Sequence, residues 1–97
     1  MAQFNIIRKS GANYTLYSFD HLFRGKSKND AYDLSNINGE LRVYTCGLYN
    51  CYEVFKTIAA AKSYIEQELT EYLADLFNLP QSAIVLNYID KKARRKN

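Results

Sequence analysis

The chain has 97 residues, of which 47% are hydrophobic and 24% are charged, and it carries a formal net charge of +3. This length fits one domain with a single core, and the hydrophobic content excludes an intrinsically disordered protein. No apolar run reaches the ~18 residues that a membrane-spanning helix needs, and the N-terminus has no apolar stretch of signal-peptide length, so we expect a cytoplasmic protein.

The charge is distributed unevenly along the chain. Five of the thirteen basic side chains lie within residues 91–97 (KKARRKN), which contain no acidic residue. Residues 1–90 therefore carry eight basic and ten acidic side chains, a net charge of −2. We expect residues 1–90 to form the folded domain and residues 91–97 to be a disordered basic tail.

The first two predicted elements form a β-hairpin. In residues 4–8, Phe4 and Ile6 point to one face of a strand and alternate with residues of the other face. A second β-rich run follows at residues 13–19 (NYTLYSF), after the turn-forming cluster SGAN at 10–13. Two short β-rich runs around a glycine-containing loop are typical of a hairpin.

The middle of the chain is more polar. Ser27, followed three residues later by Asp30, is typical of a helix start and predicts a short helix that runs through Tyr32 and Leu34. The sequence NING at residues 36–39 then predicts a turn.

A second hairpin is predicted from residues 40–46 (ELRVYTC) and 50–56 (NCYEVFK), which are both β-rich. Alternation places Leu41 and Val43 on one face of the first strand and Tyr44 on the other. Because both faces carry bulky side chains, we expect at least one of these strands to be central in the sheet.

The longest predicted element is an amphipathic helix over residues 57–78. Thr57 is a plausible N-cap, and the helix must end before Pro80. Apolar side chains recur at a spacing of three or four residues and form one core-facing stripe, which consists of Ile58, Ala61, Ile65, Leu69, Tyr72, Leu73 and Leu76.

The apolar run at residues 83–89 (AIVLNYI) is too short for most helices and predicts a last strand. Together these elements predict a single α+β domain. We expect a mostly antiparallel sheet of about four to five strands, with the long helix packed on one face.

The chain offers little catalytic or metal-binding chemistry. Cys46, Cys51 and His21 are its only cysteines and its only histidine, whereas a structural zinc site needs four nitrogen or sulfur ligands. The cysteine spacing is not that of a CxxC redox motif, and a reducing compartment favours free thiols over a disulfide. There is no phosphate-binding glycine loop or nucleophile motif around His21. We therefore expect no enzyme activity, no metal and no cofactor.

An acidic surface is the first candidate binding site. Glu68, Glu71 and Asp75 follow helical spacing and form one ridge, although a helix face of this kind is often only solvated. Complementary charge steers and selects binding partners. The candidate partner-binding residues are seven acidic and two tyrosine residues: Asp30, Tyr32, Asp33, Glu40, Tyr64, Glu66, Glu68, Glu71 and Asp75.

A basic surface is the second candidate. The tail and the segment at residues 24–28 (RGKSK) carry clustered positive charge that suits contacts with nucleic-acid phosphates. The alternative is a tail that only aids solubility. No sequence-reading motif is present, so such contacts would not be sequence-specific. The candidate nucleic-acid-binding residues are Arg24, Lys26, Lys28, Lys91, Lys92, Arg94, Arg95 and Lys96.

The sequence YEVFKTIAAAKSYIEQEL, at residues 52–69, joins an aromatic strand to an alanine-rich helix in a format common among small phage and mobile-element proteins. In size and architecture the chain resembles the small anti-CRISPR proteins that inhibit type I surveillance complexes. The resemblance implies a non-enzymatic phage-borne inhibitor whose acidic surface mimics DNA and occupies a basic nucleic-acid-binding groove of such a complex in the host cytoplasm. The basic tail departs from the strongly acidic members, and the alternative is a small nucleic-acid-binding module.

Overall fold

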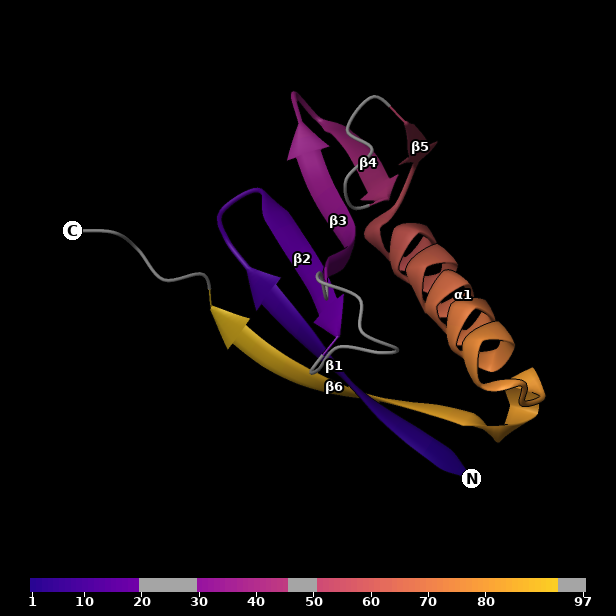
Figure 1. The fold of residues 1–97 in the computed structure, drawn as a ribbon. Coiled ribbons are helices and arrows are strands. Elements are labelled where there is room, and N and C mark those ends of the chain that lie inside the picture. The colour runs from indigo at the N-terminus through magenta and orange to yellow at the C-terminus, as the bar shows by residue number, and fades with distance from the viewer. Residues whose placement is uncertain (20–29, 46–50, 93–97) are drawn as a thin grey trace.

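The computed structural model describes residues 1–19, 30–45 and 51–92. These residues form one six-stranded sheet with a single long helix on one of its faces (Figure 1). Four of the six strands pair only in the antiparallel sense, and the sheet contains one parallel pairing. The predicted α+β class is therefore confirmed, with more strands than the four to five expected.

The elements follow each other as a chain of hairpins that ends in a helix and one more strand. They are β1 (Ala2–Ser10), β2 (Tyr14–Phe19), β3 (Asp30–Ile37), β4 (Glu40–Thr45), β5 (Tyr52–Phe55), α1 (Ile58–Phe77), a short 3-10 helix η1 (Gln81–Ala83) and β6 (Ile84–Lys92). The spatial order is β5-β4-β3-β2-β1-β6, and β6 pairs in parallel with β1. Because β5 and β6 are the two edges, α1 crosses one whole face of the sheet between them.

The core lies between α1 and this face. Apolar side chains from four strands meet one stripe of the helix, and the cluster consists of Ile6, Tyr17, Phe19, Leu34, Val43, Ala61, Ile65, Leu69 and Leu73. Full burial of one leucine or isoleucine side chain contributes about 1.5–3 kcal/mol to the free energy of folding. The face that carries these residues is called the covered face below, and the opposite face is called the open face.

Local sequence signals set both ends of α1. The Thr57 hydroxyl accepts a hydrogen bond from the backbone N–H of Ala60 at 3.1 Å, as expected of an N-cap. At the other end Asn78 adopts the left-handed conformation with φ of 55°, which asparagine tolerates better than most residues. Pro80 follows two residues later, so the predicted helix limits are confirmed.

The short helix predicted through Tyr32 and Leu34 is wrong, because both residues belong to β3. Leu34 is buried and Tyr32 packs against the core, so the two follow the period of a strand. β3 also pairs with β2 on one side and with β4 on the other. The pairing of β3 along both of its edges overrides the local sequence signal for a helix start. Ser27, the predicted cap residue, lies outside the described residues.

One residue of the predicted helical stripe is not in the core. The Ile58 side chain is 54% exposed, whereas Ile65 and Leu69 are fully buried. Ile58 lies in the first turn of α1, where it lines a cavity beside the β1–β2 hairpin instead of packing on the sheet. Periodicity alone does not show where a helix overhangs its partner.

The expected boundary of the basic tail is also corrected. β6 continues through Lys91 and Lys92, which pair in register with Lys9 and Ser10 of β1. Parallel pairing with β1 therefore extends the folded domain two residues beyond the predicted end at residue 90. Residues 93–97 lie outside the described residues.

Candidate functional site

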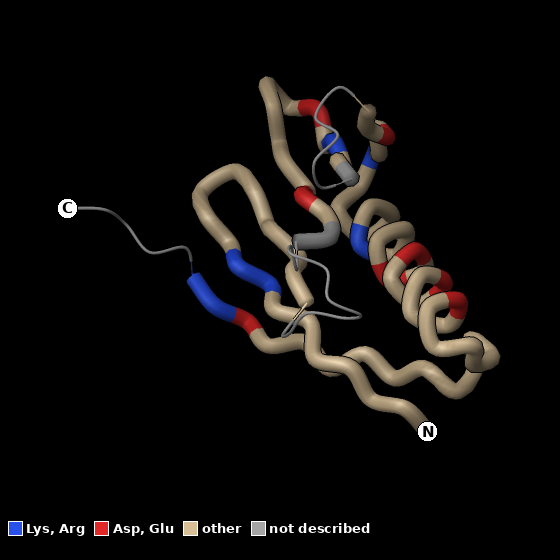
Figure 2. Tube along the Cα trace, viewed as in Figure 1, with Lys and Arg blue, Asp and Glu red and all other residues tan. Residues whose placement is uncertain are grey.

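The predicted acidic surface is divided among several places in the structure. Tyr64, Glu68, Glu71 and Asp75 follow helical spacing and lie on one flank of α1, and red segments mark the acidic ones in Figure 2. The remaining members lie elsewhere: Glu66 on the other flank of α1, Tyr32 on the covered face, and Asp33 and Glu40 on the open face. The side chain of Asp30 is outside the described residues.

The surface around the acidic ridge of α1 includes one residue, Glu53, that the sequence analysis missed. The Tyr64 ring packs against Phe55 of β5, with 5.1 Å between the ring centroids. Burial raises the pKa of Tyr64, and the negative charges of Glu68, Glu53 and Glu71 raise it further. Glu53 therefore belongs to this surface, which we call the acidic flank: Glu53, Tyr64, Glu68, Glu71 and Asp75. Strand alternation beside Phe55 was the signal that placed Glu53 there.

Tyr32 packs against the core and is not an exposed residue on which a partner could dock. Its hydroxyl donates a hydrogen bond to Glu68 Oε1 at 3.3 Å, and its ring packs against the core. Burial is the main cause that raises the pKa of Tyr32 above its ordinary value of 10.0, and the Glu68 carboxylate adds to it. The bond ties β3 to α1 and places Glu68 at the border between core and solvent.

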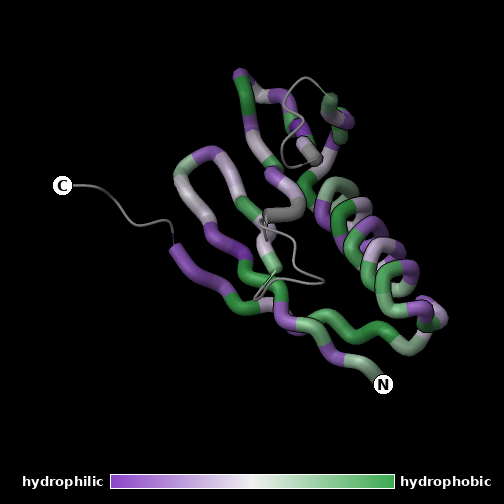
Figure 3. The backbone as a smooth tube through the Cα atoms, viewed as in Figure 1, coloured by the Kyte–Doolittle hydropathy of each residue, from purple (hydrophilic) through white to green (hydrophobic). Residues whose placement is uncertain are grey.

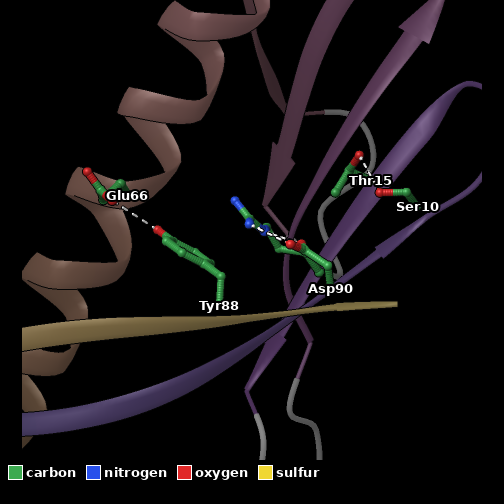
Figure 4. Close-up of polar contacts among 6 residues, drawn as sticks. Ser10, Thr15, Glu66, Tyr88 and Asp90 are labelled. Atoms are coloured by element: carbon green, nitrogen blue, oxygen red, sulfur yellow. Dashed lines mark hydrogen bonds and ion pairs between the residues drawn. The ribbon is translucent and has the colours of Figure 1, made fainter. Parts of the chain in front are cut away.

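Glu66 makes the corresponding contact on the other flank of α1. The Tyr88 hydroxyl, from β6, donates a hydrogen bond to Glu66 Oε2 at 3.2 Å (Figure 4). The guanidinium of Arg8 lies over the Tyr88 ring, 4.2 Å from its centroid. Glu66 is thus engaged with the sheet and does not join the acidic flank.

Glu40 and Asp33, on the open face, each accept a hydrogen bond from a neighbouring side chain. Glu40 Oε1 accepts a hydrogen bond from Arg42 Nε at 2.6 Å, which makes an ion pair. Asp33 Oδ1 accepts a hydrogen bond from the Ser35 hydroxyl at 2.8 Å. The ion pair offsets the charge of Glu40, whereas Asp33 keeps its charge. Both residues lie on the face opposite α1, so they do not extend the acidic flank.

A basic surface forms where β1 and β6 end side by side. The parallel register places Lys9 opposite Lys91, and Lys92 follows in the same strand. All three side chains are exposed. Figure 2 shows these blue segments next to each other, away from the acidic helix, and Figure 3 shows the same strand ends as hydrophilic. We call Lys9, Lys91 and Lys92 the basic end.

The acidic residue nearest to the basic end is already paired. Asp90 accepts hydrogen bonds from Arg8 Nε at 2.6 Å and from Arg8 Nη2 at 2.9 Å. The Arg8 guanidinium lowers the pKa of Asp90, chiefly through this hydrogen bonding. Among the described residues no ion pair involves the lysines of the basic end, so their charges stay uncompensated. Sequence reasoning found Lys91 and Lys92 but missed Lys9, because the pairing of two distant strands brings it there.

Several residues considered in the sequence analysis lie outside the described residues: His21, Cys46, the segment at 24–28, Arg94, Arg95 and Lys96. Cys51 lies one residue before β5 with an exposed thiol, and therefore not within a strand as expected. Within the described ranges no three His, Cys, Asp or Glu side chains are grouped as a metal site would require.

A cavity of about 250 Å³ lies between the first turn of α1 and the β1–β2 hairpin. Its lining combines Leu34, Leu41 and Ile58 with polar groups of the hairpin and with one charged residue, Lys62. Tyr14 and Lys62 are the titratable side chains of this lining, which contains no histidine, cysteine or carboxylate.

Comparisons with protein-family models, with curated proteins and with solved structures gave no match to this chain. In the part of the chain that the structure describes, no helix has the length and apolar character to cross a membrane.

Proposed function

We propose that this chain is a small non-enzymatic nucleic-acid-binding protein that contacts phosphates through its basic end. The observation that carries the proposal is the register of β6 on β1, which sets Lys91 beside Lys9 and continues with Lys92. The neighbouring carboxylate of Asp90 is held by Arg8, so it does not neutralise these lysines. Clustered lysines without acidic partners provide the charge that favours binding to a phosphate backbone.

The residues that follow β6 add to this charge in sequence. Arg94, Arg95 and Lys96 come within four residues of Lys92, with no acidic residue between them. Contacts of this kind position a protein on the phosphate backbone but carry no sequence information. We therefore expect binding that depends strongly on salt and weakly on base sequence.

A fluorescence-anisotropy titration of labelled DNA and RNA oligonucleotides tests this function. The triple variant Lys9→Gln, Lys91→Gln and Lys92→Gln should bind more weakly than the wild type between about 50 and 200 mM salt. Its salt dependence, the slope of log K against log salt, should fall by about 0.7–0.9 for each lost phosphate contact.

A matched control is Lys56→Gln, which removes one exposed lysine beyond β5 at the other edge of the sheet. This substitution should leave affinity and salt slope close to those of the wild type. Absence of binding at about 50 mM salt would contradict the proposed function. An equal loss of affinity in Lys56→Gln and in single variants of the basic end would also contradict it.

A second candidate function rests on the acidic flank. The negative charges of Glu68, Glu53 and Glu71 raise the pKa of Tyr64, and Asp75 continues the ridge along α1. A half-buried tyrosine within an acidic surface suits docking onto a basic, nucleic-acid-binding groove of a larger complex. This is the inhibitory function that the anti-CRISPR resemblance implies.

DNA binding by a purified type I surveillance complex, measured with and without the chain, tests the second candidate. The wild type should reduce DNA binding, and Glu71→Lys with Asp75→Lys should abolish that effect. Glu66→Lys is the control, since Glu66 lies on the opposite flank of α1 beside Tyr88. An inhibitory effect that survives reversal of the acidic flank would exclude it as the docking surface.

A further inference from the structure

The open face of the sheet carries Lys9 and Lys91 of the basic end at one edge and an aromatic cluster at the other. Among the described residues no element packs on this face, because α1 lies on the opposite one. Paired residues of neighbouring strands point to the same face. The register defines one row across the open face, from β6 to β5: Lys91, Lys9, Leu16, Asp33, Tyr44 and Tyr52.

The aromatic cluster presents Tyr52 as its outermost ring. Tyr44 and Tyr52 have ring centroids 5.1 Å apart, and the Arg42 guanidinium lies 4.5 Å from the Tyr52 centroid. Arg42 Nη1 also donates a hydrogen bond to the Tyr44 hydroxyl at 3.2 Å. Tyr44 is only 9% exposed while Tyr52 is 41% exposed. Arg42 and Tyr44 therefore support the Tyr52 ring and leave part of it open to solvent.

We infer that the open face binds single-stranded nucleic acid, with an unpaired base stacked on Tyr52 and the backbone running toward Lys9 and Lys91. This inference rests on the proposed nucleic-acid-binding function and adds the strand state of the ligand and the base-contacting residue. Aromatic rings on an exposed sheet face stack unpaired bases, while bases within a duplex are already stacked on each other.

The dimensions of the face agree with a short single strand. Strands of a sheet lie ~4.8 Å apart, so β5 and β6, with four strands between them, are separated by roughly 24 Å. Single-strand sites of OB-fold domains span about 4–16 nucleotides. One ligand can therefore contact Tyr52 at one edge and Lys91 at the other.

Two acidic residues on the same face limit the affinity. Glu40 is paired with Arg42, so this pair contributes little net charge to the face. Asp33 lies in the row between Leu16 and Tyr44, and its carboxylate accepts a hydrogen bond from Ser35. A phosphate that passes Asp33 meets a like charge, so removal of this charge should strengthen binding.

The first test compares Tyr52→Leu with Tyr52→Phe in titrations of labelled oligothymidylate and oligouridylate of about 12 nucleotides and of a duplex of equal length. The wild type should prefer the single strands. Tyr52→Leu should bind them roughly 5- to 150-fold more weakly, which is the loss expected for one stacked base. Tyr52→Phe keeps the ring and should bind like the wild type.

One outcome would overturn this inference and leave the proposed function intact. In that outcome the chain binds single strands and duplex with equal affinity, Tyr52→Leu has no effect on binding, and Lys9→Gln weakens it. Absence of binding to every oligonucleotide would overturn both. A concentration-dependent dimer that dissociates on Tyr52→Leu, seen by light scattering, would overturn the inference by assigning this face to a second copy of the chain.

A second variant keeps the test valid if Tyr52→Leu does not fold. Asp33→Asn retains a hydrogen-bond acceptor for Ser35 but removes the negative charge from the row. It should strengthen binding to single strands several-fold at low salt, and the gain should shrink as salt screens the charge. Unchanged or weaker binding in Asp33→Asn would contradict a phosphate path across this face.

Discussion

The covered and open faces of the sheet use tyrosine in opposite ways. On the covered face the hydroxyls of Tyr32 and Tyr88 donate hydrogen bonds to Glu68 and Glu66, on the two flanks of α1. These rings pack on the core and their polar ends are engaged within the fold. On the open face the Tyr52 ring is supported by neighbours but keeps a large exposed fraction.

The difference shows that burial, not residue type, separates structural tyrosines from those available for binding. A tyrosine between sheet and helix fills space with its ring and satisfies its hydroxyl at the border of the core. A tyrosine on an uncovered face makes no such contribution to helix packing. The choice of which face α1 covers therefore decides which tyrosines remain accessible.

Truncation of a core side chain is the strongest test of this contrast. Leu69 is fully buried in the helix stripe, so Leu69→Ala should lower the free energy of unfolding by about 2–5 kcal/mol. Val54→Ala, on the open face where Val54 is 52% exposed, should cost about 0.5 kcal/mol or less. Chemical denaturation followed by circular dichroism measures both values. Similar losses for the two variants would show that the open face is also packed.

Much of the fold could be predicted from the sequence because its signals are local. Alternation in residues 4–8, the Thr57 cap and the periodicity around Ile65 and Leu69 each act within a few residues. The strand character of residues 30–34 could not be predicted in this way. It depends on pairing with β2 and β4, which lie elsewhere in the sequence.

The candidate surfaces were predictable only in part. The ridge of Glu68, Glu71 and Asp75 follows from helical spacing and is present on α1. Lys9 lies 82 positions from Lys91, and only the parallel pairing of β1 with β6 brings them together. Both faces of β4 carry bulky side chains, so alternation did not indicate which of them the helix would cover.

Removal of one hydroxyl should have a smaller effect than core truncation and should again distinguish the faces. Tyr32→Phe loses the hydrogen bond to Glu68 and should cost about 0.5–1.5 kcal/mol at neutral pH. Tyr52→Phe should cost less, because no hydrogen bond of its hydroxyl to another described residue ties it to the fold. Urea denaturation of both variants measures the difference, and an equal cost would remove the proposed distinction.

The same tyrosine predicts a pH dependence at the alkaline end. The folded state raises the pKa of Tyr32 above its ordinary value of 10.0, chiefly by burial. The unfolded chain therefore loses the proton first, and this residue's contribution to stability is lost as the pH rises above 10.0. Tyr32→Phe should show a smaller alkaline loss of stability than the wild type. An identical loss in both would assign the alkaline transition to other groups.

The ion pair between Arg8 and Asp90, at the margin of the covered face, should give the smallest effect because both side chains are accessible to solvent. The pKa of Asp90 lies below its ordinary value of 3.8 in the folded state, so its contribution is present above that pH and is lost as the pH falls through the folded value. Asp90→Asn should therefore lower the urea midpoint slightly at about pH 6, and its difference from the wild type should shrink as the pH falls below 3.8. A difference that does not shrink in acid would instead reflect altered packing of Arg8 on Tyr88.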